Sequence, residues 1–125
     1  MGYNVGLRPA TDEERAHFFG AQNLPTPPAE TLQHLYAITA DGEHIGGLWM
    51  IPAQDGFWVI HRVAVDKAWR RQGVATAVLE IAGRLARYNG ASALMVTPLV
   101  TDRGTLALNA KCGFTTVACL QVKPL

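Results

Sequence analysis

The feature that most constrains this chain is a short segment that leads into its clearest helix. The segment reads AWRRQGVAT, residues 68–76, and apolar side chains between Gly73 and Asn89 then recur at helical spacing. A glycine costs about 1 kcal/mol inside a helix, and cations are disfavoured at the positive end of a helix dipole. A glycine and two arginines at this place therefore predict a binding site for a negative group.

A phosphate or pyrophosphate group fits this arrangement. Backbone N–H groups point outward at the start of a helix, where the dipole also favours negative charge. Gly73 lets the backbone approach a ligand without a side chain in the way. Two familiar phosphate-binding patterns, GxxxxGK[ST] and GxGxxG, do not occur in the sequence, so the anion site belongs to another class.

The composition is that of one soluble globular domain. The chain has 125 residues, of which 49% are hydrophobic and 17% are charged. A net charge of +1 predicts no strong general attraction to nucleic acid or to an anionic membrane. No apolar run approaches the roughly 20 residues needed to cross a bilayer, and residues 1–15 lack the apolar core of a signal peptide.

The cysteines and histidines do not predict a metal site. Cys112 and Cys119 have no zinc-binding spacing, and the histidines show no HExxH pattern. Cys112 ends an expected helix, where the dipole disfavours a thiolate, so we interpret it as a packing residue. We therefore expect a cytoplasmic protein with free thiols and without a metal.

Local signals predict strands and helices that follow one another along the chain. Thr11 and Glu14 have the spacing of a capping box, Thr26 before Pro27 predicts a short second helix, and Asp41-Gly42 predicts a tight hairpin turn. The expected strands cover residues 3–9, 35–40, 43–51, 57–65, 92–96 and 114–122, and the expected helices cover residues 11–20, a short segment from 27, 73–89 and 101–113.

Two of these elements carry predictions about burial. The strand 57–65 is apolar at nearly every position, which predicts burial on both faces. The long helix is expected to bury one apolar stripe, formed by Val74, Val78, Ile81, Ala82, Leu85 and Tyr88.

The spacing Arg70-x-x-Gly73-x-Ala75 matches the [Q/R]-x-x-G-x-[G/A] signature of the GNAT superfamily of N-acyltransferases. The chain resembles that family in three blocks that occur in the family's order. They are DGEHIGG, VAVDKAWRRQGVAT and ALNAKCGF. The resemblance covers roughly residues 35 to 118, and more loosely the opening LRPATDEE.

The resemblance implies an α/β (α+β) fold with a mixed, splayed central sheet flanked by helices, the GNAT-like acyl-CoA N-acyltransferase fold, in a single domain over residues 1–125. It also implies that acetyl-CoA is the co-substrate. The pantetheine arm of the coenzyme would pair with the expected strand 57–65, and the pyrophosphate of the coenzyme would lie at the start of the expected helix 73–89. The residues expected to bind it are Val63, Val65, Arg70, Arg71, Gln72, Gly73, Val74, Ala75 and Thr76.

Two residues are candidates for catalysis. Attack on a thioester needs a free amine, and His61, beside the expected thioester, could accept the proton because imidazole titrates near neutral pH. Asn109 stands where many family members carry the tyrosine that protonates the departing thiolate. An asparagine can only donate a hydrogen bond there. The Asp12-Glu13-Glu14 group, Glu43 and Asp55 are lesser candidates for the base.

The sequence thus predicts an N-acetyltransferase that moves an acetyl group from acetyl-CoA to a small-molecule or peptide amine. The alternative is a catalytically weak or inactive GNAT-like module that binds coenzyme A and acts through a partner. We expect a homodimer, because residues 114–122 read as a last strand without a following partner, and because Phe18, Phe19 and Trp49 have little nearby chain to bury them.

Overall fold

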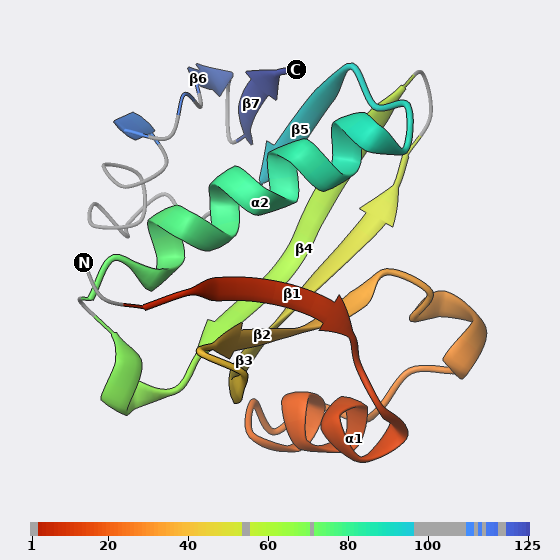
Figure 1. Ribbon diagram of the computed structural model, residues 1–125. Coiled ribbons are helices and arrows are strands. Elements are labelled where there is room, and N and C mark those ends of the chain that lie inside the picture. Colours follow the sequence, from red (N-terminus) through yellow and green to blue (C-terminus); the bar gives the residue numbers. More distant parts are fainter. Residues whose placement is uncertain are drawn as a thin grey trace. The chain divides into compact units, whose positions relative to one another are not determined.

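The computed structural model describes residues 3–53, 56–70, 72–96, 110–111, 113, 115–117 and 120–125 (Figure 1). Two compact units divide the chain. The first contains residues 1–50 and 62–78, and the second contains residues 51–61 and 79–125. The elements are β1 (Val5–Pro9), α1 (Asp12–Gly20), the 3-10 helix η1 (Ala29–Thr31), β2 (Leu35–Ala40), β3 (Glu43–Pro52), β4 (Phe57–Val65), the 3-10 helix η2 (Lys67–Trp69), α2 (Val74–Tyr88), β5 (Ala93–Val96), β6 (Thr115–Val117) and β7 (Leu120–Pro124).

The first unit contains antiparallel strands in the order β1-β2-β3, with the end of β4 next to β3. The turn between β2 and β3 is the predicted one. Asp41 and Gly42 both have positive φ, at 50° and 86°, as a tight two-residue hairpin turn requires. A shift in register between Ile38 and Thr39 marks an irregularity opposite the start of β3.

Helix α1 begins at the predicted capping box. The Glu14 N–H donates to the Thr11 hydroxyl oxygen at 3.2 Å, and the Thr11 N–H donates to the Glu14 carboxylate at 3.0 Å. The helix is held in place by Phe18, which is buried. Gly47 of β3 is required beneath it, because a Cβ there would collide with the Phe18 ring.

The prediction of a second helix capped by Thr26 is wrong. Instead, a single 3-10 turn begins at Ala29, and Pro28 before it is extended, with φ −56° and ψ 144°. The reason is local. A residue that precedes a proline is disfavoured in the helical region, so Pro27, which precedes Pro28, is a poor first residue for a helix.

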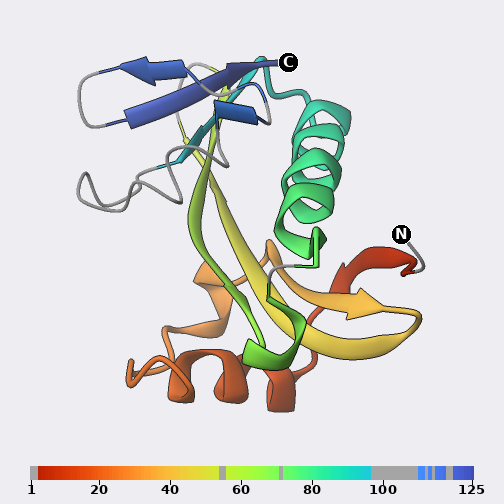
Figure 2. The same cartoon turned by 90° about the vertical axis from the view of Figure 1, so that its left-hand side faces the viewer.

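The second unit contains strands in the order β4-β5-β7-β6. β4 and β5 are parallel, whereas β5–β7 and β6–β7 are antiparallel, so the sheet is mixed. Figure 2 shows β6 and β7 side by side. The prediction of one unpaired last strand is therefore wrong, because β6 and β7 are two strands that pair with each other.

Burial differs from the prediction in β4 and α2. Trp58 and Ile60 of β4 are buried, but residues 61–63 are exposed, so the strand is not covered on both faces. In α2 the outlier is Tyr88, which is 88% exposed. Four buried side chains of α2 lie four residues apart along one face, and they are Val74, Val78, Ala82 and Ala86. Leu79, next to Val78, is also buried.

Some predictions concern residues outside the described ranges. Most of the expected helix over residues 101–113 lies outside these ranges, including Asn109 and Cys112. Cys119, further along the chain, also lies outside them. Gly113, within the description, has the positive φ of 92° that suits the residue after a helix. None of the helices in the described part of the chain is both long and apolar enough to cross a membrane.

Candidate active site

The start of α2 has the geometry expected of an anion site. Gly73 has φ 77°, a conformation that residues with a Cβ rarely adopt. Its carbonyl oxygen accepts the first helical hydrogen bond, from the Ala77 N–H at 3.2 Å. The N–H groups of the first turn have no acceptor within their own helix, and that turn, VATA, contains no acidic side chain. The N–H groups of this first turn are therefore not used by the backbone of their own helix.

Two side chains brace the loop before this helix. The Arg70 Nε donates to the Val65 carbonyl oxygen at 3.0 Å, and the Gln72 Nε2 donates to the Ala68 carbonyl oxygen at 3.0 Å. Both residues were expected to bind coenzyme, and each also shapes the loop, which the sequence did not indicate. Arg71 lies outside the described residues.

The backbone of β4 offers donors and acceptors beside this loop. The Asp66 N–H donates to Ile45 of β3 at 2.8 Å, and the Ala64 carbonyl lies against Gly46 of β3. Because backbone groups alternate between the two edges of a strand, those of Val63 and Val65 face the other edge. β5 pairs with β4 only from Phe57 to Ile60.

Val63 and Val65 were expected to pair with the pantetheine arm, and their backbone groups face the edge of β4 that is turned away from β3. Val63 is 43% exposed. The Val65 carbonyl already accepts from Arg70, so its N–H is the group that a ligand would use. The candidate base His61 lies on the same strand, two residues before Val63, and is exposed. The second catalytic candidate, Asn109, lies outside the described residues.

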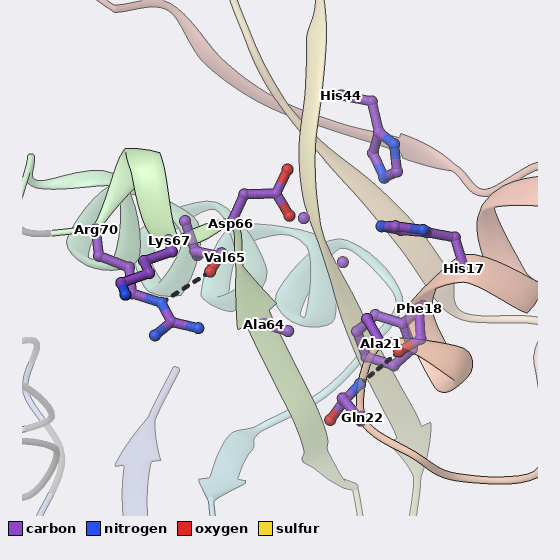
Figure 3. A pocket seen from close by; sticks show the side chains of 12 residues that line it. His17, Phe18, Ala21, Gln22, His44, Ala64, Val65, Asp66, Lys67 and Arg70 are labelled. Atoms are coloured by element: carbon purple, nitrogen blue, oxygen red, sulfur yellow. Dashed lines mark hydrogen bonds between the residues drawn. The ribbon is translucent and has the colours of Figure 1, made fainter.

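A cavity of about 200 Å³ lies in the first unit, against the end of β4. The residues that line it are His17, Phe18, Ala21, Gln22, His44, Gly46, Gly47, Ala64, Val65, Asp66, Lys67 and Arg70. Figure 3 shows His17 and His44 directed toward each other, with Asp66 facing them and with Lys67 and Arg70 on the far side. We call this the inner cavity.

Glu14, which contacts His44 of the inner cavity, has a strongly lowered pKa. Two hydrogen bonds from Arg8, at 2.7 and 2.6 Å, and one from the Thr11 N–H lower the pKa of Glu14 from 4.5 to about 2. The Glu14 Oε2 also lies 3.7 Å from the Nδ1 of His44. The helix cap therefore holds an ionised carboxylate beside an imidazole.

Arg8→Ala is expected to give a stability loss that depends on pH. Because the pKa of Glu14 is lowered by folding, its contribution is complete above about pH 4.5 and fades toward about pH 2. The difference in free energy of unfolding between wild type and Arg8→Ala should shrink over that window in urea titrations. Arg84→Ala, at an exposed position of α2, should give a difference that does not change with pH. A constant difference for Arg8→Ala would contradict the assignment.

Comparison with known families decides the identity. The profile described as "Acetyltransferase (GNAT) family" matches residues 7–114, most of the chain. The chain belongs to the GNAT acetyltransferase family. Comparison with curated protein sequences gives no match.

Solved structures give the same fold for this GNAT acetyltransferase. An acetyltransferase from Bacillus subtilis in complex with CoA has a TM-score of 0.82 at 17% identity, over 98% of this chain and 99% of that chain. The ribosomal-protein-S18-alanine N-acetyltransferase from Escherichia coli has a TM-score of 0.78 at 16% identity, over 97% and 94%. A GNAT family acetyltransferase from Elizabethkingia anophelis with acetyl-CoA bound has a TM-score of 0.74 at 18% identity, over 98% and 99%. The predicted fold is confirmed.

The inner cavity was not predicted for this GNAT protein. Its histidines come from α1 and β3, which are far apart in sequence, so only the packing of α1 brings them together. One local signal was available, since His17 lies three residues after Glu14 and so shares its helix face. Among the described residues, no group of three or more His, Cys, Asp or Glu side chains could hold a metal ion.

Proposed function

We propose that residues 1–125 form one domain that transfers an acetyl group from acetyl-CoA to a primary amine by direct attack. The observation that carries this proposal is the start of α2, where Gly73 turns the backbone with positive φ and the first helical turn contains no acidic side chain. Gly73 follows Val63 of β4 by ten residues in the sequence. Similar folds hold CoA or acetyl-CoA in the Bacillus subtilis and Elizabethkingia anophelis proteins.

In this proposal the coenzyme is bound mainly by the backbone. The N–H groups of residues 73–76 hold the pyrophosphate, and the edge of β4 at Val63 and Val65 pairs with the pantetheine arm. Arg71 and the guanidinium nitrogens of Arg70 that do not bond Val65 add positive charge. A backbone site of this kind explains why the helix start needs a glycine rather than a particular side chain.

The chemistry requires a stabilised oxyanion and a departing thiolate. The Val63 N–H is the proposed donor to the oxyanion that forms when the amine attacks the thioester carbonyl. Asn109 is proposed to donate a hydrogen bond to the sulfur. A thiol titrates near 8.5, so its departure as thiolate at pH 7 costs only about 2 kcal/mol, and His61 is the base proposed from the sequence.

The rival function is a module that binds coenzyme A without catalysis and acts through a partner. Calorimetric titration with acetyl-CoA, followed by measurement of free thiol released with a panel of amines, separates the two. The panel is ethanolamine, putrescine, lysine and a peptide that begins with alanine. We expect binding and release that depends on the amine. Binding without such release would favour the module, and no binding would contradict both functions.

The panel covers small amines and a peptide because the sequence left both open. The Escherichia coli protein of similar fold is a ribosomal-protein-S18-alanine N-acetyltransferase, so a peptide amine is one reasonable acceptor. We also propose a cytoplasmic location. The homodimer stays a prediction, but both of its premises are wrong. β6 pairs with β7, and Phe18, Phe19 and Trp49 are buried within the chain.

A further inference from the structure

Two cavities meet at His17 and His44. Both residues line the inner cavity, and both also line an open outer cavity of about 340 Å³. Among the described residues the outer cavity is lined by Glu13, Glu14, His17 and His44, none of which is Lys or Arg. The two imidazoles thus stand where the acidic outer cavity adjoins the inner one.

The charges are distributed unevenly around these cavities. Glu13 and Glu14 line the outer cavity, and Asp66 faces the histidines from across the inner one (Figure 3). Lys67 and Arg70 line the far side of the inner cavity, toward the helix start proposed to hold pyrophosphate. A cation is therefore attracted from the histidine side, and an anion from the opposite side.

Glu14 lies beside one ring nitrogen of His44. The His44 Nδ1 is 3.7 Å from the Glu14 Oε2, which is an ion-pair contact longer than a hydrogen bond. An ionised carboxylate can only accept, so it favours the tautomer with the proton on the Nδ1 and a lone pair on the Nε2. The His17 ring meets the His44 ring edge-on, with centroids 6.1 Å apart.

The inner cavity is small. Its volume of about 200 Å³ is below the roughly 300 to 1,000 Å³ of sites that enclose drug-sized ligands. It suits an ammonium group and the few carbons next to it. Its wall includes Ala64 and Val65, which directly follow Val63, the residue proposed to hold the thioester oxyanion.

We propose that the inner cavity binds the ammonium end of the acceptor and that His44 accepts its proton. The inference rests on the proposed function and replaces His61 by His44 as the base. The ammonium gives one proton to the His44 Nε2, and the nitrogen lone pair then forms the bond to the acetyl carbon. The carbon–sulfur bond breaks with its electrons on the thiolate, and the second nitrogen proton passes to solvent. Glu14 acts as a positioning residue.

A base is needed because the acceptor is protonated in solution. An amine like that of lysine, with a pKa near 10.4, is free in only about one molecule in a thousand near pH 7.4. The charged groups that face His44 are the Glu14 and Asp66 carboxylates and, across the inner cavity, Lys67 and Arg70. General-base catalysis contributes about a hundredfold or more.

His44→Asn tests the base, with His34→Asn as its matched control. His34 lies outside both cavities, and its Nδ1 contacts the Tyr36 hydroxyl at 3.1 Å. For the best amine of the panel, kcat/KM of His44→Asn should fall about a hundredfold near pH 7.5. The loss should narrow as the pH approaches the pKa of the amine, because free amine then accumulates. His34→Asn should keep the wild-type pH profile.

Glu14→Gln tests the positioning role. Without the carboxylate beside the imidazole, kcat should fall several-fold while KM for the amine changes little, because the base is less well oriented. A wild-type pH profile in His44→Asn, or loss of the acid limb in His61→Asn instead, overturns the proposal. Calorimetry with acetyl-CoA on the same variants separates this failure from that of the proposed function, which fails if the wild-type protein binds no coenzyme.

NMR of the wild-type protein tests the cavity without a variant and without turnover. With n-propylamine as the probe, the imidazole signals of His17 and His44 should shift along one saturation curve, and those of His34 should not. At about 0.1 M, even a site of millimolar affinity is saturated. Unchanged His17 and His44 signals at that concentration overturn the proposal.

Discussion

Gly73→Glu is expected to lower the affinity for acetyl-CoA by about a hundredfold or more while the protein stays folded. The substitution puts a carboxylate where the proposed pyrophosphate lies. Two like charges 4 Å apart repel by about 4 kcal/mol at an effective dielectric constant of 20, and salt and solvent reduce that at an exposed position. About 2.7 kcal/mol suffices for a hundredfold loss. Calorimetric titration with acetyl-CoA measures it.

Gly90→Glu is the matched control for this variant. Gly90 follows the other end of α2 and also has positive φ, at 91°, with nothing within 4 Å of its added Cβ. The control therefore carries the same charge and a similar backbone strain. Both variants should lose stability to a similar degree in thermal unfolding, but Gly90→Glu should keep its affinity for acetyl-CoA. Equal affinities in the two variants would remove the pyrophosphate from the helix start.

The features predicted correctly from sequence are those set by a few consecutive residues. The capping box of Thr11 and Glu14 needs only four residues, and the turn at Asp41-Gly42 needs only the conformational freedom of its two residues. The start of the long helix is similar, because the glycine and the apolar residues that indicate it are contiguous, and α2 begins at Val74, directly after Gly73. The resemblance to the GNAT family rests on the same local blocks.

The features predicted wrongly depend on partners that are distant in sequence or on turns without a signal. Residues 118 and 119, between β6 and β7, are Ala and Cys, which are not typical turn residues, so the chain read as one strand. Apolar spacing assigned Tyr88 to the buried stripe of α2, but a pattern cannot show where the covering elements end. For β4, burial depends on how far β5 extends beside it.

The inner cavity shows the same limit at the site. A sequence shows that His17 shares a helix face with Glu14, but not that α1 lies against β3. That packing depends on Phe18 fitting over Gly47, which is a tertiary contact. The proposed coenzyme site consists of neighbouring residues and could be proposed from the sequence, whereas the proposed acceptor site is assembled by packing and could be proposed only from the structure.

Val63→Pro is expected to lower kcat for acetyl transfer by about a hundredfold, and to weaken coenzyme binding only several-fold, as expected for one lost hydrogen bond. Proline removes the one backbone N–H proposed to stabilise the oxyanion, and the loss of one such donor costs roughly two to three orders of magnitude in kcat. The strand should tolerate it, because proline is accepted where an N–H faces away from the paired edge. Arg62, the residue before Val63, is already in the extended strand β4, which is the conformation that a residue before a proline favours.

Two further variants separate the missing N–H from other effects of the change. Val63→Ala keeps the N–H and removes most of the side chain, so it should lose at most a few-fold in kcat. Ala64→Pro places the proline on the edge that faces β3, and it should lower the free energy of unfolding by more than Val63→Pro does. Free-thiol release at saturating acetyl-CoA measures kcat. If Val63→Pro and Val63→Ala have the same kcat, the oxyanion donor is not Val63, and the thioester lies elsewhere along β4.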